Sequence, residues 1–359
     1  MAKSVSPEWL FDSGTITITR RSDLSILYRI LRFVIRPLRP HLVAPRRQFP
    51  AGSPRLPNYP RKIHGVVITE REATIPPYLP RGSNIDTPTA TESLWVYDFH
   101  FTRVTQNRNQ PKYDIFYFPG GGFQTPASRE HFKFCARLAS SISRSRVTLV
   151  SYPLAPHSPA AQTLPLLRRW LLKALRDATT DGTNVILLGD SSGANIALSL
   201  GLWCADQLAI LGPETADHRD LGRLKSVLAI SPPTDLRNIN PAAALVDPQD
   251  PVLGKRTADA AAKAWAAGGD ARDPYLSLNL ANLGNVRACG MRIHGVLGTA
   301  DVLAPDALEF LEKCRKESIQ GNWLVWEGQM HCFPLAACYG LREGKEARDW
   351  IVDALIGVS

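Results

Sequence analysis

The hydrophobic pattern of the chain predicts alternating strands and helices from residue 63 onward. Short runs rich in β-branched and aromatic residues, bounded by Gly, Pro or Asp, are typical of strands. The predicted strands are Ile63–Glu70, Leu94–Thr102, Tyr113–Phe118, Val147–Tyr152, Val185–Leu188, Ser226–Ile230, Ile293–Leu297 and Trp323–Trp326. The predicted helices are Ala127–Ile142, Leu164–Ala178, Ala194–Leu208, Pro305–Glu317 and Arg342–Ile356. This alternation predicts an α/β fold with a mostly parallel sheet of about eight strands and helices on both faces.

Two segments depart from the alternation and divide the chain. Residues 236–290 are rich in Ala, Asp, Asn and Pro, with a helical piece near Ala258–Ala267, which predicts an insertion over the top of the sheet. Residues 1–62 contain an apolar run from Leu24 to Ile35, followed by a stretch rich in Pro and Arg. We therefore expect an N-terminal arm (1–62), a first part of the core (63–235), an insertion (236–290) and the remainder of the core (291–359).

The charge of the chain is concentrated in the arm. The 359 residues carry a net charge of +9, and residues 1–62 hold 12 Lys or Arg against 3 Asp or Glu, so the rest of the chain is balanced. A nucleic-acid-binding protein would carry this charge on a folded face, so we expect no nucleic-acid partner. Apolar and basic positions together in residues 24–43 leave two interpretations open: a helix that packs on the main domain or covers it, and a helix lying on a membrane surface.

The cysteine usage of the chain points to a reducing compartment. The six cysteines include no CxxC pair, and in a chain of this length they are typical of buried thiols. No apolar run reaches about 18 residues, so no transmembrane span is expected. The first 20 residues lack a basic start followed by an apolar core, and we expect a cytoplasmic protein, with membrane association left open.

The strongest chemical signal is the run Gly189-Asp190-Ser191-Ser192-Gly193, which lies between a predicted buried strand and an apolar helix. This is the pattern G-x-S-x-G in the strand–turn–helix context of a nucleophilic serine. Glycines two positions before and after Ser191 allow the sharp turn that exposes its hydroxyl group. Ser192 does not fit the central position, because its flanking residues would be Asp190 and Ala194.

A serine nucleophile needs a base, and the base needs an acid that orients it. Asp301 follows the strand Ile293–Leu297, and His331 follows the strand Trp323–Trp326, so both lie at strand C-terminal ends, where active sites of open α/β sheets gather. We expect His331 to take the proton of Ser191 and Asp301 to hold the imidazole. Asp306 and Glu309 are alternative acids.

The run Pro119-Gly120-Gly121-Gly122-Phe123 follows another strand and predicts an oxyanion hole. Consecutive glycines can turn backbone N–H groups towards one point. The N–H groups of Gly121 and Gly122, together with that of Ser192, are the expected donors.

These residues resemble the hormone-sensitive-lipase-like family of α/β-hydrolases over about residues 95–358. The resemblance also rests on Tyr152-Pro-Leu-Ala-Pro156, Ser231-Pro-Pro-Thr-Asp-Leu236 and Asp273-Pro-Tyr-Leu-Ser277. It implies an α/β-hydrolase fold with a helical lid formed by residues 1–62 and 236–290. It also implies hydrolysis of carboxylic esters with short or medium acyl chains, without a cofactor or a metal. The family histidine of the HGGG motif is Pro119 here, so the side chain that usually braces this loop is missing.

The expected function is that of a serine carboxylic-ester hydrolase with a small-molecule substrate. Two alternatives remain at this point. The same three side chains could transfer the acyl group to an alcohol or amine, or could serve in an elimination or cyclisation of a specialised metabolite; and the fold could carry a non-catalytic binder.

Overall fold

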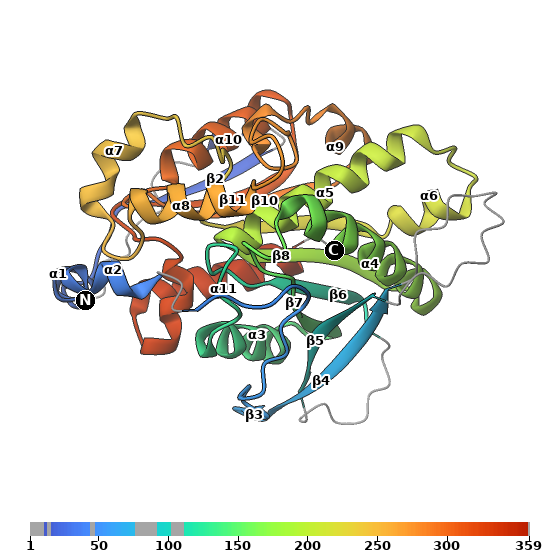
Figure 1. Ribbon diagram of the computed structural model, residues 1–359, viewed down its shortest axis with the longest axis horizontal. Helices are drawn as coiled ribbons and strands as arrows, with labels where there is room; N and C mark the ends of the chain where they lie inside the picture. The colour runs from blue at the N-terminus through green and yellow to red at the C-terminus, as the bar shows by residue number, and fades with distance from the viewer. Residues whose placement is uncertain (1–10, 13–15, 44–46, 76–91, 102–110, 358–359) are drawn as a thin grey trace.

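The computed structural model describes residues 11–12, 16–43, 47–75, 92–101 and 111–357. These residues form a central sheet of 11 strands with helices on both faces (Figure 1). The strand order is β1-β2-β11-β10-β9-β8-β6-β7-β5-β4-β3. Neighbouring strands from β2 to β7 in this order are parallel, and β5, β4 and β3 continue the sheet in antiparallel pairing. The expected fold class, a mostly parallel sheet covered by helices, is confirmed.

The eight predicted strands are all present, and most extend one or more residues further than predicted; Thr102, the last predicted residue of one strand, lies outside the described residues. Their bounds are β4 Val66–Ile75, β5 Glu92–Phe101, β6 Tyr113–Phe118, β7 Ser145–Ser151, β8 Asn184–Asp190, β9 Leu224–Ile230, β10 Arg292–Gly298 and β11 Gly321–Trp326. The three further strands are β1 Phe11–Asp12, β2 Ile16–Arg21 and β3 Lys62–Ile63.

The prediction of about eight strands missed β2, which pairs in parallel with β11 along its whole length. Only two of its six residues, Ile16 and Ile18, are apolar and buried, and the others are threonines and arginines. So short an alternation is a weak signal, although it places one face of the strand in the core. Part of the basic N-terminal segment therefore belongs to the central sheet.

The helices agree with the prediction within a few residues, and several short ones are additional. Their bounds are α1 Ile26–Ile35, α2 Arg39–Leu42, α3 Arg129–Ser141, α4 Ala160–Asp181, α5 Ser192–Ile210, α6 Ala216–Leu221, α7 Ala242–Val246, α8 Lys255–Trp265, α9 Gly284–Cys289, α10 Ala304–Lys316 and α11 Arg342–Ile356. Helices α4, α5 and α10 pack on one face of the sheet, and α3 and α11 pack on the other. No helix in the described part of the chain is long and apolar enough to cross a membrane.

The six cysteines are all free thiols. Cys135, Cys204 and Cys314 are buried, as expected, whereas Cys289 is exposed and the other two are half-buried. The prediction of buried thiols is therefore wrong for Cys289, which ends helix α9 at the surface, and is met only in part by Cys332 and Cys338.

The parallel strands place the candidate residues together. The C-terminal ends of β6, β8, β10 and β11 lie at one edge of the sheet, since all four run in the same direction. The glycine loop, Ser191, Asp301 and His331 follow these four strands, which brings segments from four distant parts of the chain to one edge.

Candidate active site

Ser191 occupies a strained turn between β8 and α5. Its φ is 50° and its ψ is −125°, in a region that side-chain-bearing residues rarely adopt. A Cβ on Gly193 would lie 2.0 Å from the carbonyl oxygen of Phe118, and one on Gly189 would lie 2.4 Å from the carbonyl oxygen of Gly193. The turn therefore requires glycine on both sides of Ser191, as the sequence pattern predicts.

The structure brings the three predicted side chains into one hydrogen-bonded chain. His331 Nε2 lies 2.9 Å from Ser191 Oγ, and His331 Nδ1 lies 2.9 Å from Asp301 Oδ2. All three residues are buried. The alternative acids lie elsewhere, because Asp306 and Glu309 both accept hydrogen bonds from the side chain of Asn240.

The surroundings of His331 favour the protonated form of its imidazole. Burial lowers the pKa of His331, but the negative charge of Asp301 and their hydrogen bond outweigh burial and raise the pKa well above its ordinary value. A second buried carboxylate, Asp250, accepts backbone hydrogen bonds from Val252, Leu253 and Val302. Burial and the charge of Asp301 raise the pKa of Asp250 to about 6. Nothing in the sequence pointed to Asp250, because it lies in the irregular insertion.

The glycine loop presents its backbone to the same place as Ser191. Gly121 and Gly122 have φ values of 140° and 59°, and a Cβ on Gly121 would lie 2.3 Å from the carbonyl oxygen of Thr125. Within the described residues, the N–H groups of these two glycines donate to no protein acceptor. Both glycines line one cavity together with Ser191 and Ser192. Their backbone is therefore available to a ligand.

The resemblance implies a histidine side chain that braces the glycine loop. In this protein other groups hold the loop. The hydroxyl group of Tyr152 donates a hydrogen bond to the carbonyl oxygen of Pro119 at 2.9 Å. The buried carboxylate of Asp190 accepts a hydrogen bond from the N–H of Gly120 at 2.9 Å and another from the hydroxyl group of Tyr117 at 2.5 Å. Proline is thus compatible with an ordered loop, because its backbone carbonyl is the group that is held.

Asp190 is in turn held by a histidine that sequence reasoning missed. His131 Nδ1 accepts the N–H of Ser128, so Nε2 carries the hydrogen and donates to Asp190 at 3.3 Å. Burial raises the pKa of Asp190, but its contacts with His131, Tyr117 and Gly120 more than offset this effect and hold the pKa below its ordinary value. His131 lies within a predicted helix, where no pattern distinguishes it from a core residue.

The loop that carries His331 rests on helix α1. The hydroxyl group of Tyr28 accepts a hydrogen bond from the N–H of Met330 at 2.7 Å, and Arg32 Nη1 donates to the carbonyl oxygen of Gly328 at 2.8 Å. Cys332, next in the chain, places its Sγ 3.4 Å from His331 Nε2. Burial raises the pKa of this thiol to about 12, so it stays protonated at neutral pH.

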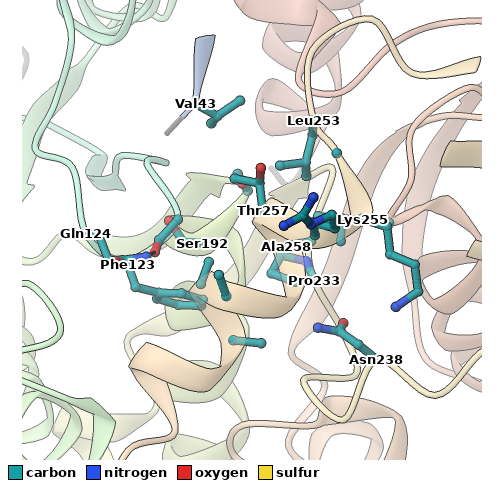
Figure 2. A pocket seen from close by; sticks show the side chains of 18 of the residues that line it. Val43, Phe123, Gln124, Ser192, Pro233, Asn238, Leu253, Lys255, Thr257 and Ala258 are labelled. Carbon is teal, nitrogen blue, oxygen red and sulfur yellow. Dashed lines mark hydrogen bonds between the residues drawn. The ribbon is translucent and has the colours of Figure 1, made fainter. Parts of the chain in front are cut away.

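A cavity of about 560 Å³ lies above Ser191. Its walls come from the glycine loop, from helix α8 and from the α2 segment, including Arg39, Pro40 and Val43. Figure 2 shows Phe123, Ser192 and Ala258 around this space. The ring of Phe123 also stacks on that of Trp265 in α8, with centroids 4.5 Å apart. The glycine loop and the helix above it are therefore packed as one unit.

Known proteins share this fold and its sequence features. The model of a family described as having the alpha/beta hydrolase fold matches residues 115–335. An esterase of Acinetobacter venetianus is 24% identical over 222 residues, which cover 62% of this chain and 67% of that protein.

Solved esterase structures are also similar. The structure of EstE5 soaked with p-nitrophenyl butyrate has a TM-score of 0.65 and 19% identity, covering 92% of this chain and 97% of that one. A thermostable esterase from Pseudomonas putida has a TM-score of 0.64 and 14% identity, covering 81% and 82%. The family match and the serine turn together show that the chain belongs to the hormone-sensitive-lipase-like family of α/β-hydrolases and is a serine hydrolase.

Proposed function

We propose that this serine hydrolase cleaves carboxylic esters of small or medium acyl length, with Ser191 as nucleophile, His331 as general base and acid, and Asp301 as the acid that orients His331. The observation that carries the proposal is the unbroken chain of two contacts at 2.9 Å from Ser191 Oγ through the imidazole to Asp301. An isolated serine would not need this arrangement.

The reaction follows from these positions. His331 Nε2 takes the proton of Ser191 as Oγ attacks the ester carbonyl carbon, and the carbonyl oxygen becomes an oxyanion. In this proposal the N–H groups of Gly121, Gly122 and Ser192 donate to that oxyanion. The C–O bond then breaks, and the leaving alcohol takes the proton from His331. Water attacks the acyl-enzyme by the same route, which releases the carboxylic acid and restores Ser191.

We also propose that residues 1–62 and 236–290 together supply a lid, although β2 belongs to the sheet. The support is that α2 and α8, one from each segment, both line the cavity above Ser191. A cavity of about 560 Å³ suits a small or medium ester. EstE5 was soaked with p-nitrophenyl butyrate, a four-carbon acyl ester, which makes this compound a suitable first substrate.

The six free thiols support a reducing compartment, and we propose a cytoplasmic location.

Hydrolysis of p-nitrophenyl butyrate by the full-length protein tests the function. We expect Ser191→Ala to lower kcat by about 10⁶-fold, because no other group supplies the nucleophile. The matched control is Ser199→Ala, since Ser199 is a buried serine on the helix that Ser191 begins, and its hydroxyl group has no partner in the described residues.

Two further measurements separate the alternatives. A fluorophosphonate should add its mass to Ser191 and to no other residue. Product analysis should find free butyric acid in water, whereas products that form only with an added alcohol or amine would indicate acyl transfer. Equal rates for wild type and Ser191→Ala would refute the proposed nucleophile.

A further inference from the structure

Helix α1 turns a large apolar surface to solvent. Tyr28 is its one buried residue, and Leu31 and Ile35 pack partly against the core on the same side. Phe33 is 82% exposed and Ile26 is 77% exposed. The remaining exposed apolar residues of this helix and the segment that follows it are Leu27, Ile30, Val34, Leu38 and Leu42. A folded helix that leaves most of its large apolar side chains exposed is unusual in a monomer and marks an interaction surface.

The helix has three sides rather than two. With 3.6 residues per turn, Tyr28, Leu31 and Ile35 face inward, and the exposed apolar residues occupy an arc of about 120° on the outer side. The arginines at positions 29, 32 and 36 form the third side, along one flank of the apolar arc. This is the distribution of a helix that lies in the plane of a lipid surface, with its apolar side in the acyl region and its cations at the headgroups.

We propose that the outer side of α1, from Ile26 to Arg36, binds an anionic lipid surface. Arg29 and Arg36 are exposed and form no ion pair among the described residues. Residues 24–43 contain four arginines and no Asp or Glu, so the segment complements negative headgroups. In an antiparallel two-fold contact with a second copy of this chain, the arginine flanks of the two helices would lie face to face, which disfavours that occupant.

The helix holds a fixed position on the protein. Tyr28 and Arg32 bind the loop before His331, and Arg32 Nη2 also donates to the carbonyl oxygen of Gln249 at 2.9 Å. The chain then continues into α2, where Arg39, Pro40 and Val43 line the cavity above Ser191. Helices α1, α2 and α7 lie at the same end of the molecule (Figure 1). A membrane bound by α1 would therefore lie close to one wall of the cavity.

Flotation with lipid vesicles tests the proposal on the full-length protein. We expect binding to vesicles of phosphatidylcholine with phosphatidylserine, and weaker binding to phosphatidylcholine alone. Phe33→Glu should lower the partition coefficient by about tenfold or more, because it replaces the most exposed apolar side chain of α1 with a charge. The double variant Arg29→Gln, Arg36→Gln should lose about tenfold on anionic vesicles only.

The matched control is Ile210→Glu, since Ile210 is 75% exposed at the end of α5, away from the arc. It should float like the wild type. All variants should hydrolyse p-nitrophenyl butyrate at the wild-type rate, which shows that they are folded. A wild type that hydrolyses nothing would refute the proposed function and leave the flotation result valid.

Three results would overturn the membrane proposal. The first is a wild type that stays at the bottom of the gradient with both vesicle types. The second is a Phe33→Glu variant that floats as well as the wild type. The third is a wild-type dimer in light scattering that Phe33→Glu converts to a monomer without any vesicle binding, which would assign the surface to a second copy.

Discussion

At position 119 a proline replaces the family histidine, and the backbone of the glycine loop is still held by hydrogen bonds. Proline supplies no brace of its own, yet its carbonyl oxygen binds Tyr152, and the next N–H binds Asp190. Both partners are buried, so they hold the loop without competition from water. The departure from the family motif at this position is therefore no argument against an ordered oxyanion loop.

The raised pKa of His331 predicts an activity that increases with pH. In the proposed mechanism the imidazole accepts the Ser191 proton only in its neutral form. Asp301 favours the charged form, so raising the pH above 6.5 increases the fraction of neutral imidazole. We expect kcat/KM for p-nitrophenyl butyrate to rise between pH 6 and pH 9. Rates with Ser191→Ala at each pH give the background to subtract. A flat profile over this range would contradict the assignment.

The variant Asp301→Asn separates the charge of Asp301 from the rest of the site. It should move the acid limb of the profile to lower pH, because the charge that raises the His331 pKa is gone, and it should lower kcat by about 10⁴-fold. Glu327→Gln is the matched control, since Glu327 is an exposed carboxylate on the loop that carries His331. An acid limb that stays in place in Asp301→Asn would show that another group sets it.

At the scale of elements, strand β2 joins the N-terminal segment to the core. Ile16 is 1% exposed, so Ile16→Ala should lower the free energy of unfolding by about 2–5 kcal/mol, through lost burial and the cavity that remains. Chemical denaturation measures the change. Thr17→Ala, on the other face of the strand, is the control and should cost less than about 1 kcal/mol. Equal effects would show that β2 does not contribute to the core.

The sequence predicts those elements and residues that local rules determine. The buried strands, the long amphipathic helices and the turn around Ser191 each carry a strong short-range pattern, and their order places Asp301 and His331 after the correct strands. The partners of these residues were not predictable. Tyr28, His131 and Asp250 act through contacts with residues far along the chain, and their own neighbourhoods look like ordinary helix or loop. Strand β2 was not predictable for the same reason, because its partner β11 is the last strand along the chain.

At the scale of the whole molecule, Arg39 connects two segments that line the cavity. Its guanidinium group donates to Asp247 and to the carbonyl oxygen of Leu253, which ties α2 to the insertion. Arg39→Met keeps much of the apolar stem and removes these contacts. We expect amide hydrogen exchange in residues 247–256 to become about tenfold faster, because the partly buried ion pair no longer opposes local opening.

The control for this experiment is Arg55→Met, since the ion pair of Arg55 with Glu70 is exposed and joins a different part of the chain. Exchange in residues 247–256 should not change in that variant. Unchanged exchange in Arg39→Met would show that the two segments cover the cavity independently.

The pairing of the first long strand with the last one has a consequence for synthesis of the protein. Ile16 pairs with Gly321, so β2 leaves the ribosome about 300 residues before its partner exists. During that interval Ile16, Ile18 and the helix that follows have no sheet edge to join. The nascent chain must therefore keep an apolar and cationic N-terminal segment apart from other chains until translation is almost complete. A fusion partner at the amino end would be carried by β2 through its late pairing with β11. A fusion partner at the carboxyl end would take no part in this step.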